Sequence, residues 1–141
     1  MRQTACRARL PNVRQFTNPR TGEQVTIVSE TPELLQMDVA WPRPGHRAAE
    51  HIHPEMEERY EVVSGTAAFR IGGAEERTAG PGETVVVPPG TPHLAWNPTD
   101  QPVALRIEMR PALRWAQFVE RLFGGEDGAA LLREFSREIR V

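Results

Sequence analysis

The sequence predicts an all-β protein that ends in two short helices, because many short apolar runs come first and a helical pattern follows. The 13 prolines and 11 glycines are spread between these runs, as in turn-rich β proteins. Several runs alternate apolar and polar residues with the period of two that belongs to strands. After Pro111 the apolar residues recur instead at helical spacing. This order is typical of a β-sandwich or barrel with a helical appendage.

Length and charge narrow the class of protein. A chain of 141 residues has the ordinary size of one domain, so we expect residues 1–141 to form a single domain. All 17 basic residues are arginine, which excludes Schiff-base chemistry on lysine, and the net charge of -2 argues against nucleic acid as a partner. No apolar run reaches the roughly 20 residues of a membrane span, so no membrane partner is expected. Cys6 is the only cysteine and no signal-peptide core is visible, which favours a cytoplasmic location.

Residues 1–24 are predicted to hold an N-terminal arm and the first strand of a hairpin. Residues 1–15 carry four arginines, no acidic residue and no periodicity, which predicts a flexible arm or an extended segment that lies on a partner. A turn signal at residues 18–22, rich in proline, glycine and asparagine, then divides a hairpin over residues 16–28.

Residues 25–110 are predicted to form the barrel, and the parity of three strands shows which of their faces meets the core. The run at residues 84–87 differs from these strands because it is apolar on both faces. The core-facing sets are Leu35, Met37, Val39 and Trp41, then Glu58, Tyr60 and Val62, and finally Val103, Leu105, Ile107 and Met109.

Residues 111–141 are predicted to form the two helices. Their apolar stripes are expected to pack against the barrel or a second subunit rather than to bind a cofactor. Exposed strand edges are commonly covered by pairing, so a homodimer is the expected assembly. The stripes are Trp115, Phe118, Val119, Leu122 and Phe123 in the first helix, and Leu131, Phe135 and Ile139 in the second.

Three of the four histidines lie in segments dense with glycine and proline, which calls for a chemical explanation. His51 and His53 are two residues apart, so on an extended backbone both imidazoles project from the same face. Glu58 follows on the core-directed face of the next strand, where no basic residue shares its face. A buried carboxylate without a partner is costly, and a metal ion is the usual remedy. His93 follows the rigid turn at residues 88–92, which can aim a third imidazole at the same ion.

We therefore predict that His51, His53, Glu58 and His93 bind one divalent transition metal. Three neutral imidazoles and one carboxylate suit iron, manganese, zinc, nickel or copper, and they do not suit calcium or magnesium. Four protein ligands leave one or two coordination positions open, as catalytic metal sites do.

With these residues the chain resembles the cupins. The two cupin motifs, G-x5-H-x-H-x4-E-x6-G and G-x5-P-x-G-x2-H-x3-N, are matched at all ten fixed positions, and 16 residues separate them. The matched residues are Gly45, His51, His53, Glu58 and Gly65 in the first motif, and Gly82, Pro88, Gly90, His93 and Asn97 in the second.

The resemblance implies a small single-domain cupin, a double-stranded antiparallel β-barrel of the jelly-roll type, with the same four metal ligands. Because cupin motifs tolerate three or four residues before the glutamate, Glu57 competes with Glu58 for the ligand role. Strand parity and the spacing to Gly65 favour Glu58. The four motif glycines are expected to be turn residues with positive φ rather than substrate contacts. His46 is expected to be a surface-loop residue.

The large side chains that face the barrel interior are expected to be core rather than pocket. Tyr60 stands apart, because a buried hydroxyl needs a partner and can transfer a proton. Arg106 alternates with core residues and is expected to be a solvated charge on the outer face. The interior set is Met37, Trp41, Tyr60, Phe69 and Trp96.

The leading functional hypothesis is a mononuclear metal enzyme, a dioxygenase-like cupin that uses iron or manganese on a small organic substrate. Glu58 and Tyr60 are its candidate catalytic residues. An isomerase, cyclase or decarboxylase that uses the same ion as a Lewis acid is the alternative, because fold and ligands do not fix the reaction. A hypothesis from another class is a non-catalytic sensor or carrier that binds a small molecule.

Overall fold

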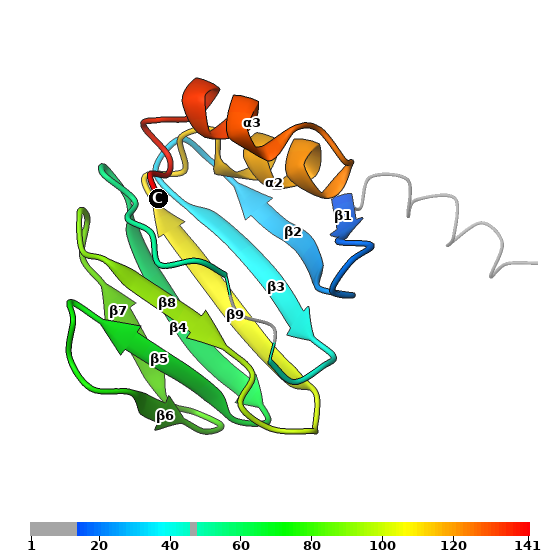
Figure 1. The fold of residues 1–141 in the computed structure, drawn as a ribbon, viewed down its shortest axis with the longest axis vertical. Coiled ribbons are helices and arrows are strands. Elements are labelled where there is room, and N and C mark those ends of the chain that lie inside the picture. The colour runs from blue at the N-terminus through cyan, green and yellow to red at the C-terminus, as the bar shows by residue number, and fades with distance from the viewer. Residues whose placement is uncertain (1–13, 46–47) are drawn as a thin grey trace, which may run out of the picture.

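Two antiparallel β-sheets form the body of the protein in a computed structural model, which describes residues 14–45 and 48–141 (Figure 1). The larger sheet has the strand order β1-β2-β3-β9-β4-β7, and the smaller sheet has the order β6-β5-β8. The larger sheet comprises β1 (Arg14–Thr17), β2 (Gln24–Glu30), β3 (Leu35–Trp41), β4 (Glu57–Ser64), β7 (Thr84–Val87) and β9 (Val103–Arg110). The smaller sheet comprises β5 (Ala67–Ile71), β6 (Arg77–Ala79) and β8 (His93–Trp96).

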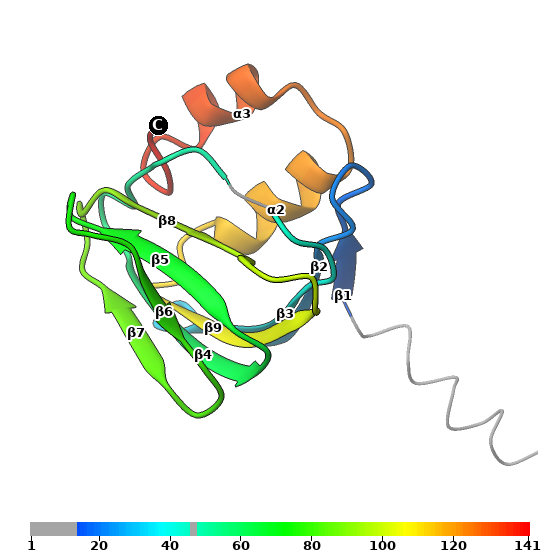
Figure 2. The same ribbon diagram turned by 60° about the horizontal axis from the view of Figure 1, so that its bottom comes forward.

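Two helices complete this jelly-roll arrangement, α2 (Trp115–Phe123) and α3 (Gly128–Glu134), so the predicted fold class is confirmed. The smaller sheet faces one half of the larger sheet, and the helices lie beside it, over the half that holds β2 and β3 (Figures 1 and 2). None of the helices in the described part of the chain is long and apolar enough to cross a membrane.

The second helix is shorter than its apolar pattern predicted. The pattern extended to Phe135 and Ile139, whereas α3 ends at Glu134 and Phe135 is its C-cap residue. Ile139 is still buried, but it comes after the turn of residues 135–138, where the chain has bent back to pair Arg140 with Ile52. The segment of residues 135–140 is called the C-terminal segment below.

The predicted hairpin is present, but the predicted arm was too long. Strands β1 and β2 pair with Arg14 opposite Ile27, and the turn between them contains Gly22 with a φ of 80°. Arg14 and Gln15 were assigned to the arm and instead belong to β1, where Arg14 pairs with Glu30 at 2.7 Å. The rest of the arm, with Cys6, and also His46 lie outside the described residues.

The parity predicted for β3, β4 and β9 is confirmed, since every predicted core-facing residue of these strands is buried. Strand β9 lies between the other two and places Ile107 opposite both Met37 and Tyr60. Strand β7 is apolar on both faces in sequence, but only Val85 and Val87 face the core. Val86 lies on the outer face opposite Arg59 and is 46% exposed. Arg106 lies on the outer face as expected, where it bonds to Asp38 at 2.7 Å.

The turn between β4 and β5 requires glycine. Gly65 has a φ of 82°, and a Cβ atom there would lie 2.5 Å from the carbonyl oxygen of Pro102. The other motif glycines, Gly45, Gly82 and Gly90, also have the positive φ that was predicted. Only at Gly65, among these four, does a close backbone contact add to the conformational requirement.

Replacement of Gly65 by alanine is expected to lower the free energy of unfolding by about 3 kcal/mol, because left-handed strain and a backbone clash act together. Gly73→Ala is the matched control. Gly73 has a φ of 75° with no atom within 4 Å of the added Cβ, so strain alone should cost about 1 kcal/mol. Urea unfolding of both variants checks this, and equal losses would contradict it.

Candidate metal centre

The four residues predicted to bind metal come together between the two sheets. His51 and His53 lie in the segment before β4, Glu58 is on β4, and His93 begins β8. One side-chain donor atom of each residue lies within 4.8 Å of the others. His53, Glu58 and His93 are buried, and His51 is partly exposed at the cavity described below.

Backbone hydrogen bonds hold the two ligand-bearing segments against each other. The His51 N–H donates to the carbonyl of His93 at 3.1 Å, and the His93 N–H donates to the carbonyl of His51 at 2.9 Å. The Gly90 N–H donates to the carbonyl of His53 at 2.8 Å. These bonds join residues more than 35 positions apart, so the convergence of the imidazoles is part of the fold.

Glu58 lies at the centre of the cluster and Glu57 does not. The Oε1 atom of Glu58 is 3.0 Å from Nε2 of His53 and also 3.0 Å from Nε2 of His93. Glu57 lies on the opposite face of β4, where it is paired in register with Arg110. The geometry therefore agrees with strand parity and with the spacing to Gly65 in favouring Glu58 over Glu57.

The outer nitrogen of each imidazole is bound to a backbone carbonyl. Nδ1 of His51 lies 2.8 Å from the carbonyl of Ala49, Nδ1 of His53 lies 2.9 Å from that of Glu138, and Nδ1 of His93 lies 2.9 Å from that of Thr91. A carbonyl can only accept, so each Nδ1 carries the hydrogen. In a neutral imidazole this leaves the lone pair on Nε2, which is the arrangement that metal-binding histidines use.

This arrangement calls for a positive charge at the centre of the cluster. Neutral His53 and His93 would direct two Nε2 lone pairs at the Glu58 carboxylate, and acceptors facing each other repel. A proton on one imidazole relieves the repulsion, and so does a divalent cation. Three imidazoles and one carboxylate form a donor set for a transition metal, so the residues fit the ion that the sequence predicted.

Without an ion, the pKa values follow the same electrostatics. Burial raises the pKa of Glu58, but the charge and hydrogen bond of His53 and the hydrogen bond of His93 outweigh it and hold this pKa well below its usual range. Burial lowers the pKa of His93, but the hydrogen bond and charge of Glu58 raise it above its ordinary value. Burial, with repulsion by His53 and His93, lowers the pKa of His51 to about 4.

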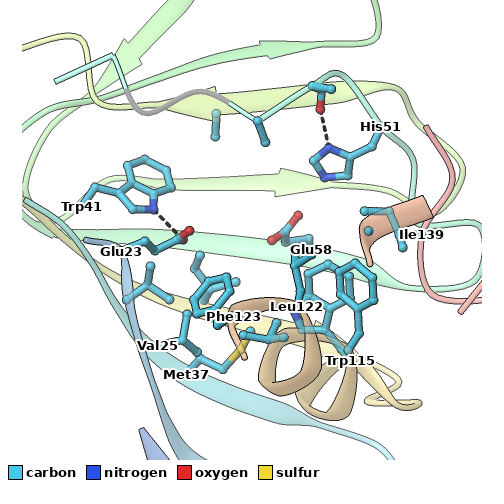
Figure 3. Close-up of a pocket in the computed structure, with 18 of the residues that line it drawn as sticks. Glu23, Val25, Met37, Trp41, His51, Glu58, Trp115, Leu122, Phe123 and Ile139 are labelled. Atoms are coloured by element: carbon cyan, nitrogen blue, oxygen red, sulfur yellow. Dashed lines mark hydrogen bonds between the residues drawn. The ribbon is translucent and has the colours of Figure 1, made fainter. Parts of the chain in front are cut away.

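A cavity of about 310 Å³ opens beside the cluster and is mostly apolar. Its walls come from β2, β3 and β9 on one side and from α2, α3 and the chain's C-terminus on the other. Figure 3 shows His51 and Glu58 at one end, and Trp41 with Glu23 at the other. The Trp41 indole N–H donates to Glu23 at 2.9 Å. The ligand cluster therefore faces a space that can hold a small molecule.

Tyr60 also lines the cavity, next to Glu58. Burial raises the pKa of its phenol well above the usual value, and the negative charge of Glu58 and a hydrogen bond with it act in the same direction. The phenol is therefore protonated at neutral pH and can donate a hydrogen bond. The proton-transfer role that the sequence suggests for Tyr60 stays a prediction.

Several residues that were expected only to pack in the core also line the cavity. Met37, Trp41 and Tyr60 were expected to be core, and they are buried, but they also form part of the cavity wall. Phe69 and Trp96 are buried away from it, so the core assignment fits these two. The apolar stripe of the first helix also faces the cavity, so its residues form the cavity wall in addition to packing against the barrel. Its cavity-lining members are Trp115, Phe118, Val119, Leu122 and Phe123.

Comparisons with known proteins agree with the motifs. A family model described as "Cupin domain" matches residues 42–108, which include all four candidate ligands. Residues 42–108 of the chain therefore form a cupin domain. A search of the curated proteins finds no match.

Three solved structures illustrate the similarity of fold. An uncharacterized conserved protein with a double-stranded β-helix domain from Klebsiella pneumoniae is 25% identical, with a TM-score of 0.56 over 63% of this chain and 76% of that one. KdgF from Halomonas sp. is 25% identical, with a TM-score of 0.61 over 72% of this chain and 97% of that one. The DMSP lyase DddQ from Ruegeria pomeroyi is 34% identical, with a TM-score of 0.52 over 59% of this chain and 41% of that one.

Metal affinity of this cupin is expected to fall as the pH falls. Each ligand must offer a lone pair, so protons compete with the ion. Because the pKa of His93 is raised in the metal-free protein, competition should begin above the ordinary histidine pKa of 6.5, whereas His51 should compete only near pH 4. Zinc titrations from pH 8 to pH 5 check this, and an affinity that stays constant over this range would contradict it.

Proposed function

We propose that this cupin is a mononuclear metal-dependent enzyme that acts on a small organic molecule with an oxygen ligand at one end and a mostly apolar body. The observation that carries the proposal is the placement of the four donors at the wall of a mostly apolar cavity. The cavity volume of about 310 Å³ lies at the lower end of the range for ligand pockets, which favours a small substrate.

A divalent ion held by His51, His53, Glu58 and His93 would supply a Lewis acid for a substrate oxygen. The apolar wall excludes water from the substrate and strengthens electrostatic interactions there. The Tyr60 phenol, protonated at neutral pH, can donate a hydrogen bond or a proton at the substrate. Glu58, which is both a ligand and the partner of Tyr60, is the second group positioned for proton transfer.

Within this function we favour proton-transfer chemistry, such as an elimination or an isomerisation, over oxidation. The cavity contains a protonated phenol beside a carboxylate, and these are the groups that such reactions use. The likeness to a DMSP lyase, at 34% identity, supports the same class. The dioxygenase expected from the sequence stays a prediction, and the donor set, which iron also accepts, makes it the second candidate. The homodimer and the cytoplasmic location likewise stay predictions.

The metal-loaded protein is expected to convert a member of a panel of small organic acids, DMSP among them, without consuming oxygen. Product formation by NMR and an oxygen electrode together check this. Oxygen uptake in proportion to product would favour the dioxygenase. Tight binding of panel members without turnover would instead favour the sensor or carrier.

Tyr60→Phe is expected to reduce the turnover number in that assay by about 100-fold and to leave the metal content unchanged, because a proton donor is lost and no ligand is. Phe69→Leu serves as the control, since Phe69 packs edge-on against Tyr60 at 5.0 Å and lies outside the cavity wall. Equal turnover in wild type and Tyr60→Phe would show that the phenol is only part of the core.

A further inference from the structure

One of the three imidazoles is hydrogen-bonded to a carbonyl that is distant in the sequence, whereas the other two are bonded to local carbonyls. Nδ1 of His51 and of His93 each bind a carbonyl two residues earlier in the same loop, at Ala49 and Thr91. Nδ1 of His53 binds the carbonyl of Glu138, which is 85 residues further along the chain. The orientation of His53 therefore depends on the C-terminal segment, which lies beyond the part of the chain that the cupin family model matches.

Glu138 is held in place by an ion pair with Arg114. Its side chain is only 1% exposed, so the carboxylate has left water and needs strong partners. The Arg114 backbone N–H and its Nε both donate to Oε2, at 3.1 and 3.2 Å, and Nη2 donates to Oε1 at 3.3 Å. The same guanidinium lies 4.3 Å above the ring of Phe135 and donates to the carbonyl of Glu134. One arginine at the start of α2 thus binds the C-terminal segment at several points.

The same segment is joined to the loop that carries His53. The Ile52 N–H donates to the carbonyl of Arg140 at 2.9 Å, and the Arg140 N–H donates to the carbonyl of Ile52 at 3.0 Å. Trp115, the next residue after Arg114, packs edge-on against the His53 ring with the centroids 4.9 Å apart. The His53 ring is therefore enclosed by the start of α2 and by the C-terminal segment.

We propose that Arg114 and Glu138 are positioning residues for the metal centre. By fixing the C-terminal segment, their ion pair holds the Glu138 carbonyl where it accepts the His53 Nδ1–H. This bond selects the tautomer whose Nε2 lone pair points toward Glu58 and the ion. The inference rests on the proposed metal function, but the orientation of His53 can be observed without a metal.

Loss of the Arg114–Glu138 ion pair should change the tautomer and ring orientation of His53, and it should leave those of the other two histidines unchanged. Without the distant carbonyl, His53 has no partner that selects the Nδ1–H tautomer, and its ring is free to rotate. His51 and His93 keep their local carbonyls, so their tautomers should persist. Metal affinity should fall by about 10- to 100-fold, as it does when other hydrogen-bond partners of ligating histidines are removed.

The test uses the double variant Arg114→Met with Glu138→Gln, which removes both charges and so leaves no buried charge without a partner. Arg137→Ala is the matched control, because Arg137 belongs to the same segment but forms an exposed ion pair with Glu55. Zinc affinity is measured by competition with a chelator. The tautomers of the three histidines are measured by ¹⁵N NMR in the metal-free proteins.

We expect weaker zinc binding and a changed His53 tautomer in the double variant, and neither change in Arg137→Ala. A folded double variant with wild-type affinity and an unchanged His53 tautomer would overturn the proposal, and so would equal changes in all three histidines. If the double variant does not fold, Glu138→Gln alone decides the matter, because it removes the ion pair while the Arg114 side chain is 45% exposed and can be hydrated. Wild-type values for both readouts in that variant would also overturn the proposal. A wild type that binds no zinc would refute the proposed function, while the tautomer measurement would still test the positioning.

Discussion

The structure depends on one electrostatic constraint, a buried carboxylate at the meeting point of three imidazoles. Glu58 is removed from water, and its closest charged or polar neighbours include the Nε2 atoms of His53 and His93. Such a group is stable only with a positive charge beside it, and either a proton or a divalent ion provides that charge. The same constraint makes the site suited to metal binding, because the ion satisfies all of the facing acceptors together.

The rest of the molecule arranges this cluster from the outside. The β-sheets place Glu58 on the inner face, backbone bonds between the two ligand segments bring the imidazoles together, and carbonyl groups fix the Nδ1–H tautomers. The helices then close an apolar cavity over the open side. Different parts of the chain contribute different groups. The cupin domain contains the ligands, and the C-terminal residues form part of the cavity wall and provide the carbonyl that binds His53.

The local sequence pattern, together with the resemblance to the cupins, was sufficient to predict the inner faces of the strands and the candidate ligands. It could not predict features that depend on packing between distant parts of the chain. Alternation with a period of two placed Tyr60 and Glu58 on the inner face, because it depends only on near neighbours along the chain. The spacing within the two motifs and the resemblance to the cupins identified the candidate ligands, and the resemblance joined His93 to the other three. The cavity could not be predicted, since whether Met37 or Trp41 meets a side chain or an empty space depends on how α2 packs. The roles of Glu23 and Glu138 were missed for the same reason, because their partners are distant in sequence and no motif marks them.

The most direct test of this account is calorimetric titration of the metal-stripped protein with manganese and zinc, for wild type and the variants Glu58→Gln and Glu57→Gln. These neighbouring glutamates lie on opposite faces of β4, so the two variants differ in position and not in chemistry. The account predicts one ion per chain in wild type and in Glu57→Gln, and binding weakened by about 100-fold or more in Glu58→Gln. Equal affinity in all three proteins, or no binding in wild type, would contradict it.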